Sequence, residues 1–70
     1  MKTTIEKLNK TKTSLSNHVA RGNQVENQRS YDLIDRYTDL KEQASQEGVW
    51  TQYCDDVGFD KSHDAYDFFA

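Results

Sequence analysis

Apolar residues in the first third of the chain recur every three or four positions, which is the spacing of one face of an α-helix. The stripe is narrow, has Lys12 in its gap, and consists of Ile5, Leu8, Leu15 and Val19. At its start, Thr3 and Glu6 have the spacing of a capping box, in which each side chain binds a backbone N–H of the other residue. The pattern predicts a helix over residues 4–21.

A second helical pattern occupies the middle of the chain. Its apolar members share one helical face and are Leu33, Ile34, Tyr37, Leu40 and Ala44. Before them, residues 23–30 contain one apolar residue, Val25, so the helix begins either near Gln24 or after a loop around Arg29. Glutamine, glutamate and arginine are good helix formers. We therefore predict a helix over residues 24–46.

Two shorter helices are expected in the last third. Trp50, Tyr53, Cys54 and Val57 stand at positions i, i+3, i+4 and i+7, which predicts an amphipathic helix over residues 49–57. Further along, Asp60 or Ser62 is placed to cap a last helix over residues 61–69. Isolated helices this short are marginal in water, so their order depends on tertiary contacts or on a partner.

Glycines separate these blocks, and no proline interrupts them. Gly22, Gly48 and Gly58 each follow a periodic stretch, where glycine commonly ends a helix. The short connection at Gly22 favours antiparallel packing of the two long helices. We therefore predict an all-α fold, an antiparallel helical hairpin with one or two short C-terminal helices packing over it, forming one domain of residues 1–70. The expected core residues are Ile5, Leu8, Leu15, Val19, Leu33, Ile34, Tyr37, Leu40, Trp50, Tyr53 and Val57.

The chain is small and poor in apolar residues. Of its 70 residues, 34% are hydrophobic, against about 45–50% in typical globular domains, and its length is near the lower limit for a self-sufficient core. Cys54 is the one cysteine and has no partner for an intrachain disulfide. We therefore expect a homo-oligomer, with a partly disordered monomer as the alternative.

Localisation follows from what the sequence lacks. No apolar run approaches the roughly 18 residues of a membrane span, and Met1 to Thr4 is not followed by the apolar core of a secretory signal. A lone thiol fits a reducing compartment. We expect a cytoplasmic protein without a membrane partner.

Charge is distributed unevenly along the chain. The formal net charge is -3, yet residues 1–30 carry six basic residues against two glutamates. From Gly48 onward, Lys61 opposes five aspartates, and these aspartates alternate with most of the aromatic residues. Aromatic side chains contribute much of the energy of protein interfaces, and carboxylates steer a protein toward basic surfaces. The last third therefore points to binding and not to catalysis.

The sequence contains only poor candidates for a catalytic or a metal-binding site. Asp55, Asp56, Asp60, Asp64 and His63 form an oxygen-rich set, but they lack the spacing of a calcium loop. Cys54 with His18 or His63 is a conceivable nucleophile and base, but the apolar and acidic neighbours of Cys54 disfavour a thiolate. We expect a buried structural cysteine, no metal, no cofactor and no enzymatic activity.

The acidic aromatic segment has three interpretations. In the first, Trp50, Tyr53, Phe59, Tyr66 and Phe69 complete the core of the hairpin. In the second, Phe68 and Phe69 stay exposed and dock into a partner; residues 64–69 resemble the acidic, phenylalanine-ended tail of bacterial single-strand-binding proteins, which implies a docking peptide, although proline is missing and Ala70 follows. In the third, the carboxylates imitate a phosphate backbone, and size, acidity and lack of catalytic motifs are similar to those of phage-encoded inhibitors of host enzymes.

The sequence therefore favours a non-enzymatic small binding protein, an inhibitor or adaptor of the phage-accessory type, that docks this acidic aromatic surface onto a basic groove of a partner protein. The predicted partner-binding residues are Asp55, Asp56, Asp60, Asp64, Asp67, Phe68 and Phe69. One alternative is a nucleic-acid-binding regulator that uses the basic first helix, although the acidity of the whole chain makes nucleic acid an unfavourable partner. The other alternative is a purely structural homo-oligomer.

Overall fold

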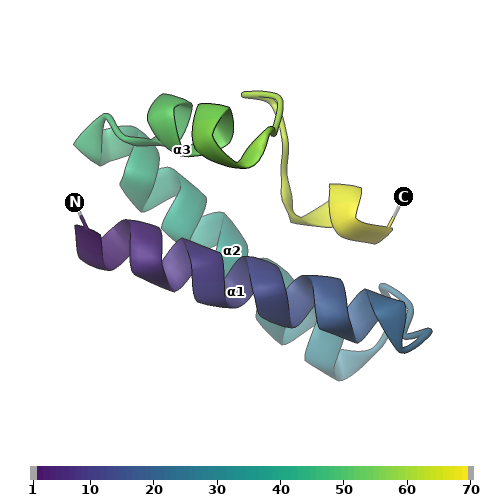
Figure 1. Ribbon diagram of the computed structural model, residues 1–70. Coiled ribbons are helices and arrows are strands. Elements are labelled where there is room, and N and C mark those ends of the chain that lie inside the picture. Colours follow the sequence, from purple (N-terminus) through teal and green to yellow (C-terminus); the bar gives the residue numbers. More distant parts are fainter. Residues whose placement is uncertain (1, 70) are drawn as a thin grey trace.

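The computed structural model describes residues 2–69, and within that range it contains helices and no strand (Figure 1). The elements are α1 (Lys2–Ala20), α2 (Gln28–Glu47), α3 (Trp50–Val57) and a 3₁₀ turn, η1 (Ala65–Phe69). The prediction of an all-α fold is confirmed.

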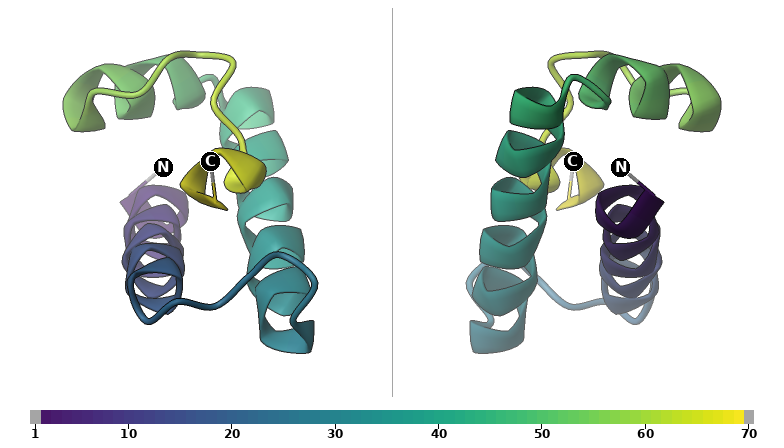
Figure 2. Two further views of the ribbon diagram at one scale, coloured as in Figure 1. Left: turned by 90° about the vertical axis from the view of Figure 1, so that its right-hand side faces the viewer. Right: turned by 90° about the vertical axis from the view of Figure 1, so that its left-hand side faces the viewer.

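Helices α1 and α2 run side by side in opposite directions and form the predicted hairpin (Figure 1, Figure 2). Helix α3 leaves the end of α2 at a steep angle and extends over the first turns of α1 (Figure 2). The chain then returns, and η1 lies between α1 and α2 in contact with both. The radius of gyration is 11.6 Å, close to the ~11 Å of a compact chain of this length.

Helix α1 buries a more polar face than its apolar residues predict. Its buried residues alternate at intervals of four and three and are Thr4, Leu8, Thr11, Leu15 and His18. Ile5 and Val19, both predicted core residues, flank this line and are only half-buried. The Thr11 hydroxyl is satisfied within the helix, because it donates to the Lys7 carbonyl at 2.9 Å.

Hydrogen bonds at the two ends of the hairpin decide which face of α1 meets α2. At one end, the Thr4 hydroxyl donates to Glu47 Oε2 of α2 at 2.9 Å. At the other end, His18 Nε2 lies 2.7 Å from the Ser30 hydroxyl, which itself donates to the Gln24 carbonyl at 2.6 Å. Since the Ser30 proton is used in that bond, Ser30 accepts from His18, and the histidine proton is on Nε2.

Both long helices begin at residues other than those predicted. Helix α1 includes Lys2, so Thr3 lies inside the helix and is not its N-cap. Helix α2 begins at Gln28 and not at Gln24, because the extended Asn27 accepts from the Arg29 N–H at 2.8 Å and caps the helix. A side-chain cap outweighs the modest helix propensity of the preceding residues.

The predicted glycine stops are confirmed at the ends of α2 and α3. Gly48 and Gly58 have φ values of 76° and 81°, a left-handed conformation that costs glycine little because it has no Cβ. The next residue in each case, Val49 or Phe59, donates to a carbonyl five residues back, at 2.9 Å and 2.8 Å. This is the Schellman arrangement, and it turns the chain sharply at both sites.

The C-terminal segment is not the helix predicted over residues 61–69; only η1 is helical there, and it is a 3₁₀ turn. The Trp50 indole donates to the Lys61 carbonyl at 3.0 Å, and Lys41 Nζ donates to the His63 carbonyl at 2.6 Å. These tertiary bonds occupy carbonyl groups that an α-helix would use internally. The cap is Asp64, which accepts from the Tyr66 N–H at 2.9 Å, and not the predicted Asp60 or Ser62.

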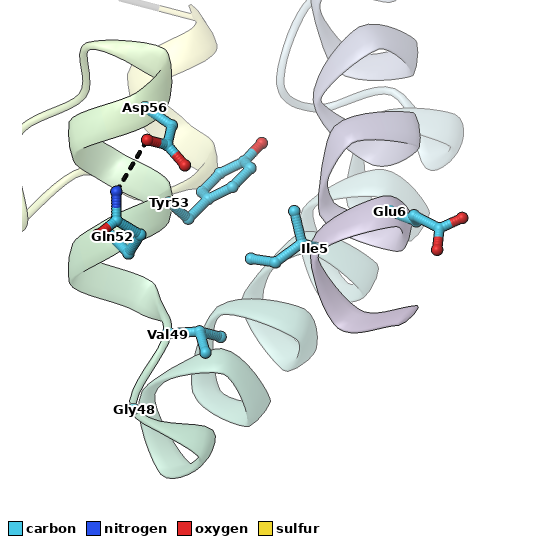
Figure 3. A pocket seen from close by; sticks show the side chains of 7 residues that line it. All are labelled: Ile5, Glu6, Gly48, Val49, Gln52, Tyr53 and Asp56. Atoms are coloured by element: carbon cyan, nitrogen blue, oxygen red, sulfur yellow. Dashed lines mark hydrogen bonds between the residues drawn. The ribbon is translucent and has the colours of Figure 1, made fainter. Parts of the chain in front are cut away.

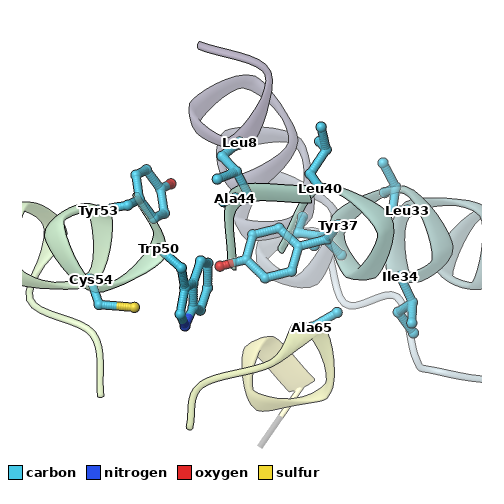
Figure 4. Packing of buried hydrophobic residues seen from close by; sticks show 11 residues of the cluster. Leu8, Leu33, Ile34, Tyr37, Leu40, Ala44, Trp50, Tyr53, Cys54 and Ala65 are labelled. Carbon is cyan, nitrogen blue, oxygen red and sulfur yellow. The ribbon is translucent and has the colours of Figure 1, made fainter. Parts of the chain in front are cut away.

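The core lies between the hairpin, α3 and the returning segment (Figure 4). Its buried apolar residues are Leu8, Leu15, Leu33, Ile34, Tyr37, Leu40, Ala44, Trp50, Tyr53, Cys54 and Ala65. Eight of the eleven predicted core residues are among them, while Ile5, Val19 and Val57 are half-buried. The buried side of α3 is the predicted face of Trp50, Tyr53 and Cys54.

Candidate protein-binding surface

The five aspartates of the last third are all exposed. Asp55 and Asp56 stand on α3, where Asp55 forms an ion pair with Lys61 at 2.8 Å and Asp56 accepts from the Gln52 amide at 2.9 Å. The side chains of the ion pair are more than half exposed, so it contributes little to stability. These contacts orient the two carboxylates and leave them open to solvent.

The other three carboxylates follow along the returning segment. Asp60 accepts from the Ser62 hydroxyl at 3.1 Å. Asp64 caps η1, and Asp67 Oδ2 accepts from the backbone N–H of Asp64 at 3.0 Å. These local bonds link the three exposed carboxylates to neighbouring groups of the same segment.

Phe68 and Phe69, the predicted docking residues, are half-buried and pack against the core. The Phe68 ring meets Tyr37 edge to face with centroids 5.4 Å apart, and Phe69 meets His18 at 6.4 Å. The first interpretation of the segment describes them better than the second does, since both help to cover the hairpin. The exception to that interpretation is Tyr66, which is 55% exposed.

His63 is the centre of the aromatic cluster under the acidic surface. Its ring stacks on Phe59 with centroids 3.9 Å apart and meets Phe68 edge to face at 5.0 Å. Burial lowers the pKa of His63 and outweighs the nearby carboxylates of Asp67 and Asp64, which act to raise it. The imidazole is therefore neutral at pH 7. It packs as an aromatic ring of the core, and its Nδ1 lies 3.4 Å from the Tyr37 hydroxyl as a hydrogen-bond partner.

A pocket of about 600 Å³ opens between α1 and α3, beside the acidic surface (Figure 3). Ile5 and Tyr53 extend toward each other across it, Val49 stands at the base of α3, and Asp56 lies at its rim. The helical pattern did not predict this pocket, because it placed Ile5 in the core, whereas Ile5 is half-buried. The residue that could have indicated the pocket is Ile5. It is apolar, and it stands at the edge of an apolar stripe that is too narrow to bury it fully.

Basic side chains of α1 meet α2 on another part of the surface. The exposed side chains of Lys7, Lys10 and Arg36 line a shallow hollow of about 430 Å³. Asp39 lines the same hollow and offsets part of their charge. The net positive charge of this cluster is therefore smaller than the number of lysines in the first helix indicates.

Cys54 is fully buried, as predicted. Burial raises the pKa of its thiol, and the opposing influence of Lys61 and Lys41 is smaller.

Among residues 2–69, no three histidine, cysteine or acidic side chains are grouped so that they could hold a metal ion. Within the same range, no helix has the length and apolar character needed to span a bilayer.

Comparison of the chain with protein-family models, curated proteins and solved structures finds no significant match. The fold and the candidate surface therefore define only a general class of protein. It is a small helical hairpin whose C-terminal segment packs over it and carries an exposed acidic face.

Proposed function

We propose that this protein is a non-enzymatic binding module that presents its acidic C-terminal surface to a basic groove of a partner protein. The observation that carries the proposal is the exposure of all five aspartates of the last third, with Lys61 as the one cation of that segment among the described residues. An inhibitor or adaptor of the phage-accessory type is the form of this function that best suits so small and acidic a chain.

The arrangement of the surface supports this role. The carboxylates take part in local hydrogen bonds, and the segment after α3 is tied to α3 by Trp50 and to the hairpin by Lys41. A rigid surface loses little conformational entropy on binding. The buried portions of Phe68 and Phe69 pack against the core beneath the surface, and their exposed portions remain predicted contacts with the partner.

The test is affinity capture from cell extract at low and moderate salt, with the wild type and with a variant that carries Asp56→Asn, Asp60→Asn, Asp64→Asn and Asp67→Asn. We expect capture to weaken with salt and to be lost in the variant, because attraction between exposed charges is screened. A control variant replaces Asp32, Asp35 and Asp39 of α2, which are also exposed, with asparagine and should capture the same proteins as the wild type. Capture that is insensitive to salt and to the first variant contradicts the proposal.

A second candidate function is nucleic-acid binding through Lys7, Lys10 and Arg36, which line one hollow between α1 and α2. A gel shift at two salt concentrations separates the two functions. Nucleic-acid binding predicts a shift that weakens steeply with salt, since cations on the protein displace counterions from phosphates. The acidic-surface function predicts no shift under either condition.

A further inference from the structure

Two hollows follow one another along the hairpin, between α1 and α2. The first has a volume of about 430 Å³ and the second about 210 Å³. Thr11 lines the first and Ser14 the second, and these residues lie about one helical turn apart on α1. The two hollows therefore form one groove, called here the basic groove. Its cations are Lys7, Lys10, Arg21, Arg29 and Arg36.

The basic groove lies on the side of the hairpin opposite the acidic surface. Ile5 of α1 faces α3 (Figure 3), and Lys7 is rotated about 160° around the helix axis from Ile5. On α2, Lys41 donates to the His63 carbonyl, and Arg36 is rotated about 140° from Lys41. Helix α3 and η1 both lie on one side of α1 (Figure 1). The acidic surface therefore cannot reach the groove of its own molecule.

The cations of the groove have no anionic partner within residues 2–69. None of the five forms an ion pair there, and Asp39 is the one carboxylate among the described lining residues. Apart from Lys61, they are all of the exposed cations whose side-chain exposure the structure describes. Arginine and lysine bind carboxylates through charge-assisted hydrogen bonds. The groove is therefore suited to a surface rich in carboxylates.

A second copy of this chain carries such a surface. Its last third has five exposed aspartates, with Lys61 as the one cation of that segment among the described residues. Nucleic acid is the weaker candidate, because a duplex carries one negative charge per ~1.7 Å and meets a chain whose net charge is -3. A second copy has only that modest net charge, and its acidic side can face the groove while its basic side faces away.

We propose that the acidic surface of one molecule docks into the basic groove of a second molecule. Two different surfaces meet, so the interface is heterologous and builds head-to-tail rows or rings. Exposed ion pairs are individually weak and are screened by salt, so the association is reversible and strongest at low salt. It covers the surface that the proposed function presents to another protein, but it does not rest on that function.

Sedimentation velocity at several protein concentrations, in low and in moderate salt, measures this association. The groove variant carries Lys7→Gln, Lys10→Gln and Arg36→Gln, which removes three positive charges. We expect it to associate about tenfold more weakly than the wild type, because each of three exposed ion pairs contributes about twofold to the affinity.

The matched control has the same net charge as the groove variant but an intact groove. It carries Ser16→Glu, Thr38→Glu and Gln46→Glu, at exposed positions that line neither hollow. It should associate as the wild type does. A thermal melt of each variant verifies that the fold is retained.

A mixing experiment tests the head-to-tail geometry. The acid variant carries Asp56→Asn, Asp60→Asn, Asp64→Asn and Asp67→Asn and keeps its groove, whereas the groove variant keeps its acidic surface. Each variant alone should sediment as a monomer. Their equimolar mixture should form a dimer that grows no further, because one acidic surface and one groove remain to pair.

Each failure has a distinct meaning. A wild type of constant monomer mass at low salt overturns this proposal and leaves the proposed function standing, since capture of another protein does not need self-association. Equal weakening in the groove variant and its control is an effect of net charge and overturns the proposal. Growth of the mixture beyond a dimer indicates a different interface and also overturns it. A nucleic-acid gel shift that the groove variant abolishes, without self-association of the wild type, assigns the groove to nucleic acid instead.

Discussion

At the scale of single residues, the most informative feature is the buried hydrogen-bond chain from His18 through Ser30 to the Gln24 carbonyl. It joins the last turns of α1 to the first turn of α2 and closes the loop between them. His18 and Ser30 are 7% and 0% exposed, so neither has water as a ready substitute partner. This bond therefore orders the loop end of the hairpin.

Replacing Ser30 with alanine should therefore destabilise the protein. The change leaves His18 Nε2–H and the Gln24 carbonyl without their partner, and an unsatisfied buried group costs about 1–3 kcal/mol. Urea unfolding of the variant measures this loss. Ser16→Ala is the control, because Ser16 is exposed on α1 and alanine favours a helix. Equal stability of the two variants would contradict the role assigned to the bond.

At the scale of elements, the start of α2 depends on one side chain. Asn27→Ala removes the cap on the Arg29 N–H and should cost about 1 kcal/mol. Hydrogen exchange of the amides in the first turn of α2 should accelerate with it. Asn9→Ala, within α1 and exposed, should leave that exchange unchanged. If the amides of this turn stay protected from hydrogen exchange in the Asn27→Ala variant, then the hydrogen bonds of Ser30, and not the Asn27 cap, order the start of α2.

The returning segment should be sensitive to acid through His63. Its pKa is lowered in the folded protein, chiefly by burial, whereas a histidine in the unfolded chain titrates near 6.5. Below about pH 6.5 the unfolded chain therefore binds more protons than the folded one, and stability falls as the pH is lowered toward the folded pKa. Well above pH 6.5, His63 is neutral in both the folded and the unfolded chain, so its titration no longer lowers the free energy of unfolding.

Thermal melts between pH 7.5 and 5 measure this dependence. The variant His63→Phe keeps an aromatic ring between Phe59 and Phe68 and should show a flatter pH profile than the wild type. Lys41 still donates to the backbone carbonyl of residue 63 in this variant, whereas the hydrogen bond between the Tyr37 hydroxyl and His63 Nδ1 is lost, so the slope of the pH profile and not the absolute stability is the readout. An unchanged slope in His63→Phe would mean that another group carries the pH dependence.

At the scale of the whole molecule, the segment after α3 acts as a cover for the hairpin. Phe68 contacts Tyr37, Phe59 and His63, which come from α2 and from the segment itself. Phe68→Ala should lower the free energy of unfolding by about 2 kcal/mol, less than the 3–5 kcal/mol of a fully buried phenylalanine. Tyr66→Ala, two residues earlier and exposed, should cost far less. Similar losses in both would contradict the covering role.

Homo-oligomerisation stays a prediction drawn from the small size and low apolar content of the chain. Among the described residues, a single chain already buries eleven apolar residues in its core, so association is needed less for stability than the composition indicates. Sedimentation velocity at several protein and salt concentrations measures it. A species of constant monomer mass under all conditions would contradict the prediction.

The exposed carboxylates of the candidate surface could be predicted from the sequence, whereas the half-burial of Phe68 and the pocket between α1 and α3 could not. Exposure of Asp55 and Asp64 follows from the cost of burying an unpaired charge, which holds in any fold. The half-burial of Phe68 does not follow, because an aromatic residue near the end of a chain packs inward only if a surface such as Tyr37 is there to receive it. The pocket beside Tyr53 likewise depends on the angle between α3 and α1.

The sequence by itself determined the features that rest on local physics. These are the helical periodicity, the left-handed turns at Gly48 and Gly58, and the buried face of α3. Tertiary structure alone decided which face α1 buries, because the bond from Thr4 to Glu47 joins residues 43 positions apart. It also decided the conformation of the last segment, where Trp50 and Lys41 take the carbonyl groups that a helix needs. Those choices depend on partners that are distant in sequence, and no local pattern encodes them.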